Sequence, residues 1–287
     1  MSRGMQFEDF FQFEVAKKKE EDIEELNPEH EPQTADGNKR LADQYIAKGY
    51  VHQSITRYKK AARLDNTAGH RTDLGDAYAY AELPINAVSQ YRRAIKKDPA
   101  EPEPHFSLAE VYARFGRWRA AISEYEKAVE LGPENAHYRY KLSCAYAKVG
   151  EYPAAIRQLE HAVLLCPDDC FYRFELASAY ADADRLDEAL PEMARAVAMS
   201  PGDDYYAARL GILCARVGLL EEAVIVLQRA IQLNPSKAAY KYLLAAVYYN
   251  LGLHEKAKSV CDEAGDLHPY ELEFLERARR FVEGGRW

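Results

Sequence analysis

The sequence predicts an all-α fold in which antiparallel helix pairs stack into a solenoid, and three recurring features lead to this prediction. Proline recurs at a fixed step of 34 residues, at positions 99, 133, 167, 201, 235 and 269, with an alanine five residues before each one. A leucine followed four positions later by tyrosine places both side chains on one helix face. Glycine follows this pair in most units. The features share one period and one phase, which is typical of a repeat protein.

Each unit is expected to contain two helices that cannot bury their apolar faces without a neighbouring copy. Leu74, Gly75 and Tyr78 illustrate the first helix, in which a small residue stands beside the leucine. A glycine such as Gly116 ends that helix because it accepts a positive φ without a Cβ clash. Alanine then lets the second helix approach the first closely, and proline stops it. The predicted repeats span residues 35–67, 68–101, 102–135, 136–169, 170–203, 204–237 and 238–271.

Two repeats lack the glycine of the internal turn. Repeat two has Glu82, Leu83 and Pro84 at this place, and we expect the backbone of its turn to differ from that of the glycine turns. Repeat five has Asp184, and aspartate tolerates a left-handed conformation better than most residues.

The succession of leucine, small residue, tyrosine, glycine, alanine, aromatic residue, alanine and proline resembles the tetratricopeptide repeat family, and the resemblance covers residues 35–271. It implies a right-handed superhelical solenoid of about seven repeats plus capping helices. It also implies a non-catalytic scaffold or adaptor for protein–protein interaction, in which the first helices line a concave groove that captures a partner segment. The solenoid itself is expected to span residues 34–271.

Residues 1–33 do not fit the repeat and are predicted to form an acidic amphipathic arm with a linker. Phe7, Phe10, Phe11 and Val15 fall on one face of a helix with 100° per residue. Such an arm could cap the first repeat of its own chain, or dock on a second copy or on a different protein. Docking on another copy or on a complex subunit gives an alternative function, that of a self-assembling scaffold.

Residues 272–287 are predicted to form a capping helix and a tail. The helix would turn five side chains inward, namely Leu272, Leu275, Ala278, Phe281 and Val282. Residues 284–287, which include two glycines and Trp287, are expected to fray.

Composition narrows the classes of partner and compartment. The net charge is −8, so the phosphate backbone of a nucleic acid is an unfavourable partner. The sequence lacks a run of about 18 apolar residues, and acidic residues interrupt its N-terminus where a signal peptide would be apolar. We therefore expect a cytoplasmic protein without direct membrane insertion. Five cysteines, an odd number, fit a reducing compartment.

The resemblance also implies which residues face the groove, because the positions two before and two after the signature leucine point into it in this family. With an acidic residue from the neighbouring turn added, the predicted partner-binding residues are Asp76, Glu103, Phe106, Glu110, Tyr140, Cys144, Phe174, Ser178, Ile212 and Tyr242. An acidic entry and an aromatic floor suit a partner segment that carries basic and apolar residues. Tyr140 and Phe174 could instead pack against the next repeat.

No enzyme motif is found, since the sequence contains no glycine-rich phosphate loop, no HExxH and no nucleophile elbow. We predict no catalytic residue, no cofactor and no metal. A further alternative is a metal- or redox-responsive protein that uses Cys166 and Cys170, with His161 nearby. One loose cysteine pair is a weak zinc signature, because structural zinc sites usually have paired short spacings twice over.

Overall fold

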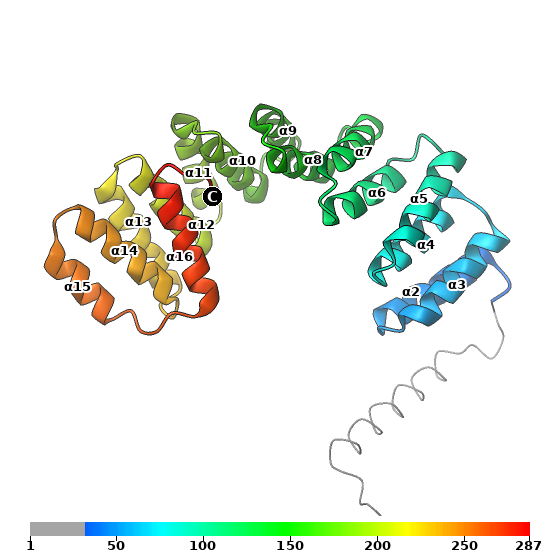
Figure 1. Ribbon diagram of the computed structural model, residues 1–287, viewed down its shortest axis with the longest axis horizontal. Helices are drawn as coiled ribbons and strands as arrows, with labels where there is room; N and C mark the ends of the chain where they lie inside the picture. The colour runs from blue at the N-terminus through cyan, green and yellow to red at the C-terminus, as the bar shows by residue number, and fades with distance from the viewer. Residues whose placement is uncertain (1–31) are drawn as a thin grey trace, which may run out of the picture. The chain divides into compact units, whose positions relative to one another are not determined.

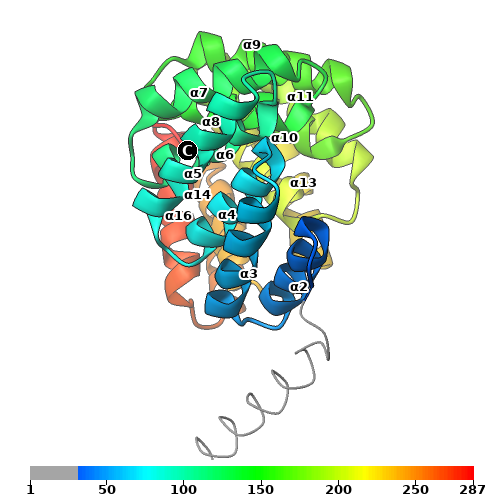
Figure 2. The ribbon, with the colours of Figure 1, turned by 90° about the vertical axis from the view of Figure 1, so that its right-hand side faces the viewer.

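The computed structural model describes residues 32–287, and every regular element in this range is an α-helix (Figures 1 and 2). The predicted arm residues Phe7, Phe10, Phe11 and Val15 lie outside the described residues. Successive helices pack as antiparallel pairs, so the predicted all-α repeat fold is confirmed. The first helices of the repeats are α2 (Ala35–Ala47), α4 (Ala68–Tyr80), α6 (Pro102–Arg114), α8 (Ala136–Lys148), α10 (Cys170–Asp182), α12 (Asp204–Arg216) and α14 (Ala238–Asn250). The second helices are α3 (Val51–Leu64), α5 (Pro84–Lys97), α7 (Trp118–Leu131), α9 (Tyr152–Leu165), α11 (Leu186–Met199), α13 (Leu220–Leu233) and α15 (His254–Asp262), and α16 (Pro269–Val282) follows them.

The helices form two compact units, which divide between Leu131 and Gly132. The first unit contains α2 to α7, and the second contains α8 to α16. Within a unit, contacts also join first helices of successive repeats, as between α4 and α6 or between α12 and α14. First helices therefore lie side by side and share one face. We call it the first-helix face, formed by α2, α4 and α6 in the first unit and by α8, α10, α12 and α14 in the second.

Small residues set how closely the two helices of a repeat approach. A Cβ atom added to Gly75 of α4 would lie 2.4 Å from the ring of Tyr91, which is fully buried in α5. A Cβ atom on Gly211 of α12 would lie 2.7 Å from the side chain of Leu227 in α13. The small residue beside the signature leucine is thus required by the packing of a large side chain from the second helix.

The turn of repeat two has the same backbone as the glycine turns, so the expectation of a different backbone was wrong. Glu82 has a φ of +57°, close to the +69° of Gly116, and Asp184 has +60°. The Leu83 amide donates to the Tyr78 carbonyl at 2.9 Å, the bond that also closes the glycine turns. The hydrogen bonds and the helix packing impose this turn on every repeat, whichever residue occupies the position.

The last helix differs from the predicted cap in its limits and in its buried face. α16 begins at Pro269 rather than at residue 272, and Leu272 is 49% exposed, which corrects its inward assignment. Ala278 and Phe281 are buried as predicted, and Glu271, which was not predicted to face inward, is buried as well. α16 contacts α12 and α14, so it lies on the first-helix face of the second unit (Figure 1).

Every helix in residues 32–287 is too short or too polar to span a lipid bilayer.

Replacing Glu82 by glycine should stabilise the chain. A left-handed conformation costs a residue with a Cβ atom about 1 kcal/mol, and glycine would remove this cost. The greater freedom of glycine in the unfolded chain offsets part of the stability gained. We expect the free energy of unfolding to rise by about 0.5 kcal/mol in chemical denaturation of Glu82→Gly. The reciprocal variant Gly116→Glu should lose stability. An added Cβ atom at this site has no neighbour within 4 Å, so the loss would come from the left-handed backbone alone. A loss of stability in Glu82→Gly would contradict this account of the turn.

Candidate functional site

In the first unit, each first helix carries a carboxylate that binds a tyrosine of the second helix in the same repeat. The tyrosine hydroxyl donates the hydrogen bond, and the partners are always 15 residues apart: Tyr58 to Asp43, Tyr91 to Asp76 and Tyr125 to Glu110. All three tyrosines are buried, so each hydroxyl needs an acceptor. Asp76 and Glu110 were predicted to guide a partner electrostatically, which stays a prediction, and the structure shows that they join the two helices of a repeat.

The other predicted residues of the first unit lie on the same face. Glu103 is exposed in the first turn of α6, and the half-buried ring of Phe106 lies 5.7 Å from the ring of Tyr125. Part of the Asp76 side chain is exposed, yet loss of hydration raises the pKa of its carboxyl group, against hydrogen bonds from Tyr91 and Ser107. The charge of Glu103 also raises the pKa of Asp76. The structure therefore brings these acidic groups together on α4 and α6.

The corresponding positions of the second unit are apolar or weakly polar. Leucine or methionine stands where the first unit has tyrosine, at Leu159, Met193 and Leu227, and each is buried. Cys144, Ser178 and Ile212 stand where the first unit has acids. Where the second helix loses its tyrosine, the first helix loses its carboxylate as well, because a buried hydroxyl without an acceptor is costly. The 15-residue spacing of acid and tyrosine is the sequence signal that could have identified these pairs.

Tyr140 and Cys144 lie on α8 and are half-buried. The ring of Tyr140 packs edge-on against Phe171, with centres 4.9 Å apart, and lies 6.3 Å from Tyr172. Burial raises the pKa of the Cys144 thiol. Tyr140, Phe171 and Tyr172 form a partly exposed aromatic cluster on the first-helix face of the second unit.

Two predicted contact residues are buried, which corrects their assignment. Phe174 is 4% exposed and stacks on Tyr206, with ring centres 4.2 Å apart and planes 11° apart. Ile212 is 2% exposed and belongs to the same core as Ala278 and Phe281 of α16. Inter-repeat packing thus covers Phe174, and α16 packs over Ile212.

α16 covers the part of the first-helix face that contains Tyr242, the last of the predicted binding residues. A cavity of about 520 Å³ remains between α12, α14 and α16, lined by Ile212, Tyr242, Leu275, Val282 and others. The Tyr242 hydroxyl donates to the Gly265 carbonyl at 3.2 Å. The chain thus occupies its own first-helix face in repeats six and seven with an amphipathic helix.

Glu271 anchors the N-terminus of α16. Its side chain is 1% exposed and accepts hydrogen bonds from the backbone amides of Ala239, at 3.1 Å, and His268, at 3.0 Å. Burial opposes ionisation of Glu271, but the two amide hydrogen bonds outweigh it and lower its pKa. One carboxylate therefore caps α16 and ties it to the first turn of α14.

The residues after α16, Gly284–Trp287, form an ordered contact that we call the tail segment. The Trp287 amide donates to Asp182 Oδ1 at 2.8 Å, and Arg216 Nη1 donates to the Gly285 carbonyl at 3.1 Å. The guanidinium carbon of Arg209 lies 3.8 Å from the centre of a Trp287 ring. The expectation that this segment frays was wrong, because α10 and α12 hold it at both main-chain and side-chain atoms.

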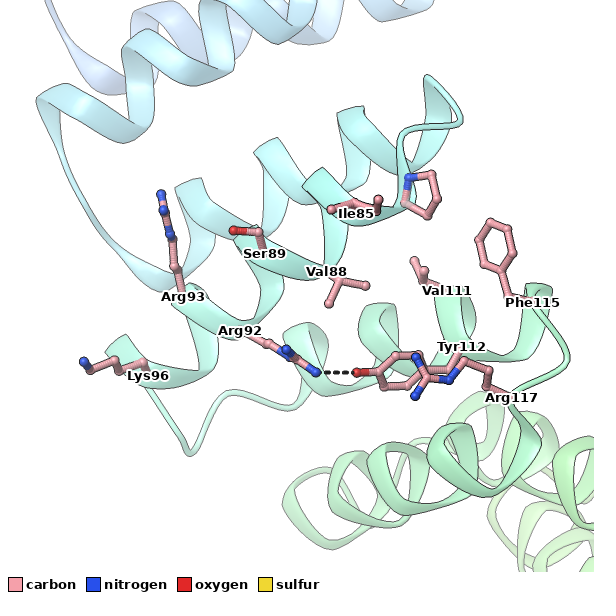
Figure 3. Close-up of a pocket in the computed structure, with 11 residues that line it drawn as sticks. Ile85, Val88, Ser89, Arg92, Arg93, Lys96, Val111, Tyr112, Phe115 and Arg117 are labelled. Atoms are coloured by element: carbon pink, nitrogen blue, oxygen red, sulfur yellow. Dashed lines mark hydrogen bonds between the residues drawn. The ribbon is translucent and has the colours of Figure 1, made fainter.

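A hollow that the sequence analysis missed lies between α5 and α6 of the first unit (Figure 3). This α5–α6 pocket has a volume of about 730 Å³ and contains Ile85, which is 85% exposed, and Phe115, which is 57% exposed. Arg92 Nη2 donates to the Tyr112 hydroxyl at 3.0 Å. The pocket is lined by Pro84, Ile85, Val88, Ser89, Arg92, Arg93, Lys96, Val111, Tyr112, Phe115 and Arg117. It thus combines apolar side chains with the cationic side chains of Arg92, Arg93, Lys96 and Arg117.

The described part of the chain shows no metal-binding geometry for the alternative function that uses Cys166 and Cys170. Within residues 32–287, no group of three or more His, Cys, Asp and Glu side chains is placed to hold a metal ion. Cys166 and Cys170 are half-buried free thiols, and His161 is exposed. A redox role for the two cysteines stays a prediction.

Comparison with known proteins identifies the repeat. The family model described as "Tetratricopeptide repeat" matches residues 72–136, 140–204, 174–238 and 208–271, which together cover more than half of the chain. No curated protein sequence matches the chain.

Solved structures share the fold at low sequence identity. A tetratricopeptide repeat protein from Parabacteroides merdae has a TM-score of 0.60 and 15% identity, over 86% of this chain and 100% of that one. MamA has a TM-score of 0.55 and 25% identity, over 60% of this chain and 94% of that one. YrrB, described as having an unusual peptide-binding site, has a TM-score of 0.54 and 23% identity, over 66% of this chain and 100% of that one.

The anchoring role of Glu271 predicts a pH dependence. Its folded pKa lies below its unfolded value, so its stabilising contribution is present above the unfolded pKa of about 4.3 and is lost as pH falls through the folded pKa. We expect Glu271→Gln to cost about 2 kcal/mol at neutral pH and to remove this acid-dependent part. Hydrogen exchange of the Ala239 amide measures the effect locally, and Glu273→Gln, at an exposed position of α16, is the matched control. Unchanged protection of Ala239 in Glu271→Gln would contradict the anchor.

Proposed function

We propose that this chain, which belongs to the tetratricopeptide repeat family, is a non-catalytic scaffold or adaptor. It would capture a segment of a partner protein on its first-helix faces. Domains of this family generally mediate protein–protein interactions, and their fold is usually non-catalytic. No catalytic domain is identified in the described part of the chain. The chemistry of these faces supports a captured segment that carries basic and apolar residues.

The observation that carries this proposal is the occupancy of the second unit's face by the chain itself. α16 lies on α12 and α14 as an amphipathic helix, and the tail segment continues along α10 and α12 with hydrogen bonds to its main chain. An amphipathic helix in a groove and an extended segment are both recurring modes of peptide recognition. The surface therefore has the shape and the polar groups that such a segment needs. YrrB, a protein of the same fold, carries a peptide-binding site according to its description.

The first unit offers a first-helix face as well, formed by α2, α4 and α6. Asp76, Glu103 and Glu110 give this face a negative charge, and Phe106 contributes an apolar contact. Lysine or arginine beside apolar side chains in a partner segment would complement it. The aromatic cluster at Tyr140 offers a second apolar contact, in the second unit.

Alanine substitution of Phe106 and Tyr140 tests the proposal. Both side chains are half-buried, so their loss removes contact area without opening a core cavity, which substitution of the buried Phe174 would do. We expect the double variant to retain roughly a tenth or less of the partner proteins captured from source lysate, since aromatic anchors dominate such interfaces. Quantitative mass spectrometry of the captured proteins is the measurement.

The matched control is Leu164→Ala with Ile225→Ala, two exposed apolar residues on second helices. Capture should be unchanged in this control, and melting temperatures verify folding in both variants. If the Phe106 and Tyr140 variant captured the same proteins as the wild-type chain, the first-helix faces would not be the binding surface.

The α5–α6 pocket favours a second candidate function, docking of the predicted N-terminal arm. Residues 1–31 contain ten acidic and four basic residues, a net charge of −6 out of the chain's −8. Arg92, Arg93 and Lys96 line the pocket beside the exposed side chains of Ile85 and Phe115. An acidic segment that carries Phe7, Phe10 and Phe11 complements this pocket in both charge and hydrophobicity. Docking between copies would make the protein a self-assembling scaffold.

Charge reversal separates this candidate from capture of other proteins. We expect the wild-type chain to self-associate in light scattering, and Arg92→Glu with Arg93→Glu and Lys96→Glu to reduce its mass to that of a monomer. The control reverses Lys59 and Arg63 of α3, a basic surface with fewer exposed apolar side chains, and should leave the mass unchanged. Raising the ionic strength should weaken association in the wild type. A wild-type chain that is monomeric at all concentrations would exclude the self-assembly candidate.

A further inference from the structure

We infer that the surface around Arg209 is a recognition site for an aromatic residue in an extended peptide segment, and that the tail segment occupies this site as an intramolecular competitor. The inference rests on the proposed function, since it names the segment that one of the first-helix faces takes. Four observations within the second unit carry it.

The first observation is the state of Arg209. Its side chain lies on α12 and is 5% exposed, and it donates hydrogen bonds only to neutral oxygens, the Tyr205 hydroxyl at 3.1 Å and Ser178 Oγ at 3.5 Å. No salt bridge joins it to a carboxylate among the described residues. Burial lowers the pKa of Arg209, and the charges of Asp182 and Glu175 act in the opposite direction. An aromatic face attracts a desolvated guanidinium, and the Trp287 ring supplies the nearest one, 3.8 Å away.

The second observation is that aromatic side chains from outside the tail segment pack around the Trp287 ring. Phe274 and Phe281 of α16 meet its ring edge-on, with centres 5.6 Å and 5.9 Å away. Their planes are inclined by 72° and 78° to that of the indole, which is the geometry that aromatic pairs prefer. Arg209, Phe274 and Phe281 therefore form a three-sided site, which we call the aromatic cage.

The third observation is that the neighbouring contacts are made to the main chain. Asp182 accepts from the Trp287 amide, and Arg216 donates to the Gly285 carbonyl. Arg216 is itself held in place by Asp184, at 2.7 Å, and by the ring of Phe281. Main-chain atoms are common to all peptides, so Asp182 and Arg216 would bind any extended segment that places an aromatic residue in the cage.

The fourth observation is how the tail segment reaches the cage. Gly284 has a φ of +93°, which lets the chain turn back at the end of α16. A Cβ atom at Gly285 would lie 2.6 Å from the Arg280 carbonyl oxygen, so the turn needs glycine there. Arg286 then lies over the ring of Tyr152, 4.5 Å away. The glycine belongs to the turn of this chain, so the segment recognised is a basic residue followed by an aromatic residue.

A tethered occupant competes at an effective concentration of about 1 mM, which masks the site from dilute peptides. Removing its aromatic side chain should therefore expose the cage to a partner segment of the same chemistry. A peptide with an intrinsic dissociation constant near 0.1 mM would bind about ten-fold more tightly once the competitor is gone.

The test uses the full chain and a fluorescein-labelled peptide with the sequence of residues 280–287 as the probe. Fluorescence anisotropy should show binding to Trp287→Ala that is about ten-fold tighter than binding to the wild-type chain. Adding Arg209→Leu to Trp287→Ala should abolish binding, whereas adding Arg195→Leu, at an exposed position of α11, should not. Peptide with alanine in place of its tryptophan should fail to bind Trp287→Ala.

A second measurement does not depend on the folding of any variant. In the wild-type chain labelled with ¹⁵N, the indole N–H signal of Trp287 should move toward its free position as unlabelled peptide is added, while that of Trp118 in the first unit stays fixed. Equal affinity of wild type and Trp287→Ala, or an unmoved Trp287 signal at saturating peptide, would overturn the inference. Loss of capture in the Phe106 and Tyr140 variant would then still support the proposed function, so the two failures are distinguishable.

Discussion

The close approach of the two helices in each repeat is the constraint on which the rest of this structure depends. Where Gly75 meets Tyr91 and Gly211 meets Leu227, no space remains for even a single added carbon atom. A large side chain of the second helix can therefore be buried only against a small residue of the first. The turn between the helices follows from the same packing, since Glu82 and Asp184 accept a left-handed backbone that glycine adopts in the other repeats.

The two units bury different side chains at the same position of the second helix. The first unit buries tyrosines whose hydroxyl groups need carboxylate acceptors, and this places Asp76 and Glu110 on the first-helix face. The second unit buries leucine or methionine at the same position and needs no acceptor there, so Cys144, Ser178 and Ile212 stand where the first unit has acids. At this position of each repeat, the side chain on the first-helix face thus depends on the residue buried beneath it, and the two faces differ there for that reason.

The second unit also shows what its face can hold. α16 and the tail segment cover α12 and α14 and part of α10, with Glu271 as the anchor at one end and the aromatic cage at the other. A cavity remains beneath the helix, so α16 covers this face without filling it. A surface that holds an amphipathic helix and an extended aromatic segment of its own chain has the geometry to recognise similar segments in other proteins.

By itself, the sequence determined the all-α class, the repeat period and the positions of the turns, because the 34-residue step places leucine, small residue, tyrosine and proline on predictable helix faces. Only the tertiary structure decided that Phe174 and Ile212 are buried and that Glu271 rather than Leu272 faces inward. It also decided where α16 and Trp287 lie. These outcomes depend on contacts that join Arg216 to Gly285 across 69 residues and Asp182 to Trp287 across 105, and such distant pairs leave no periodic signal along the chain.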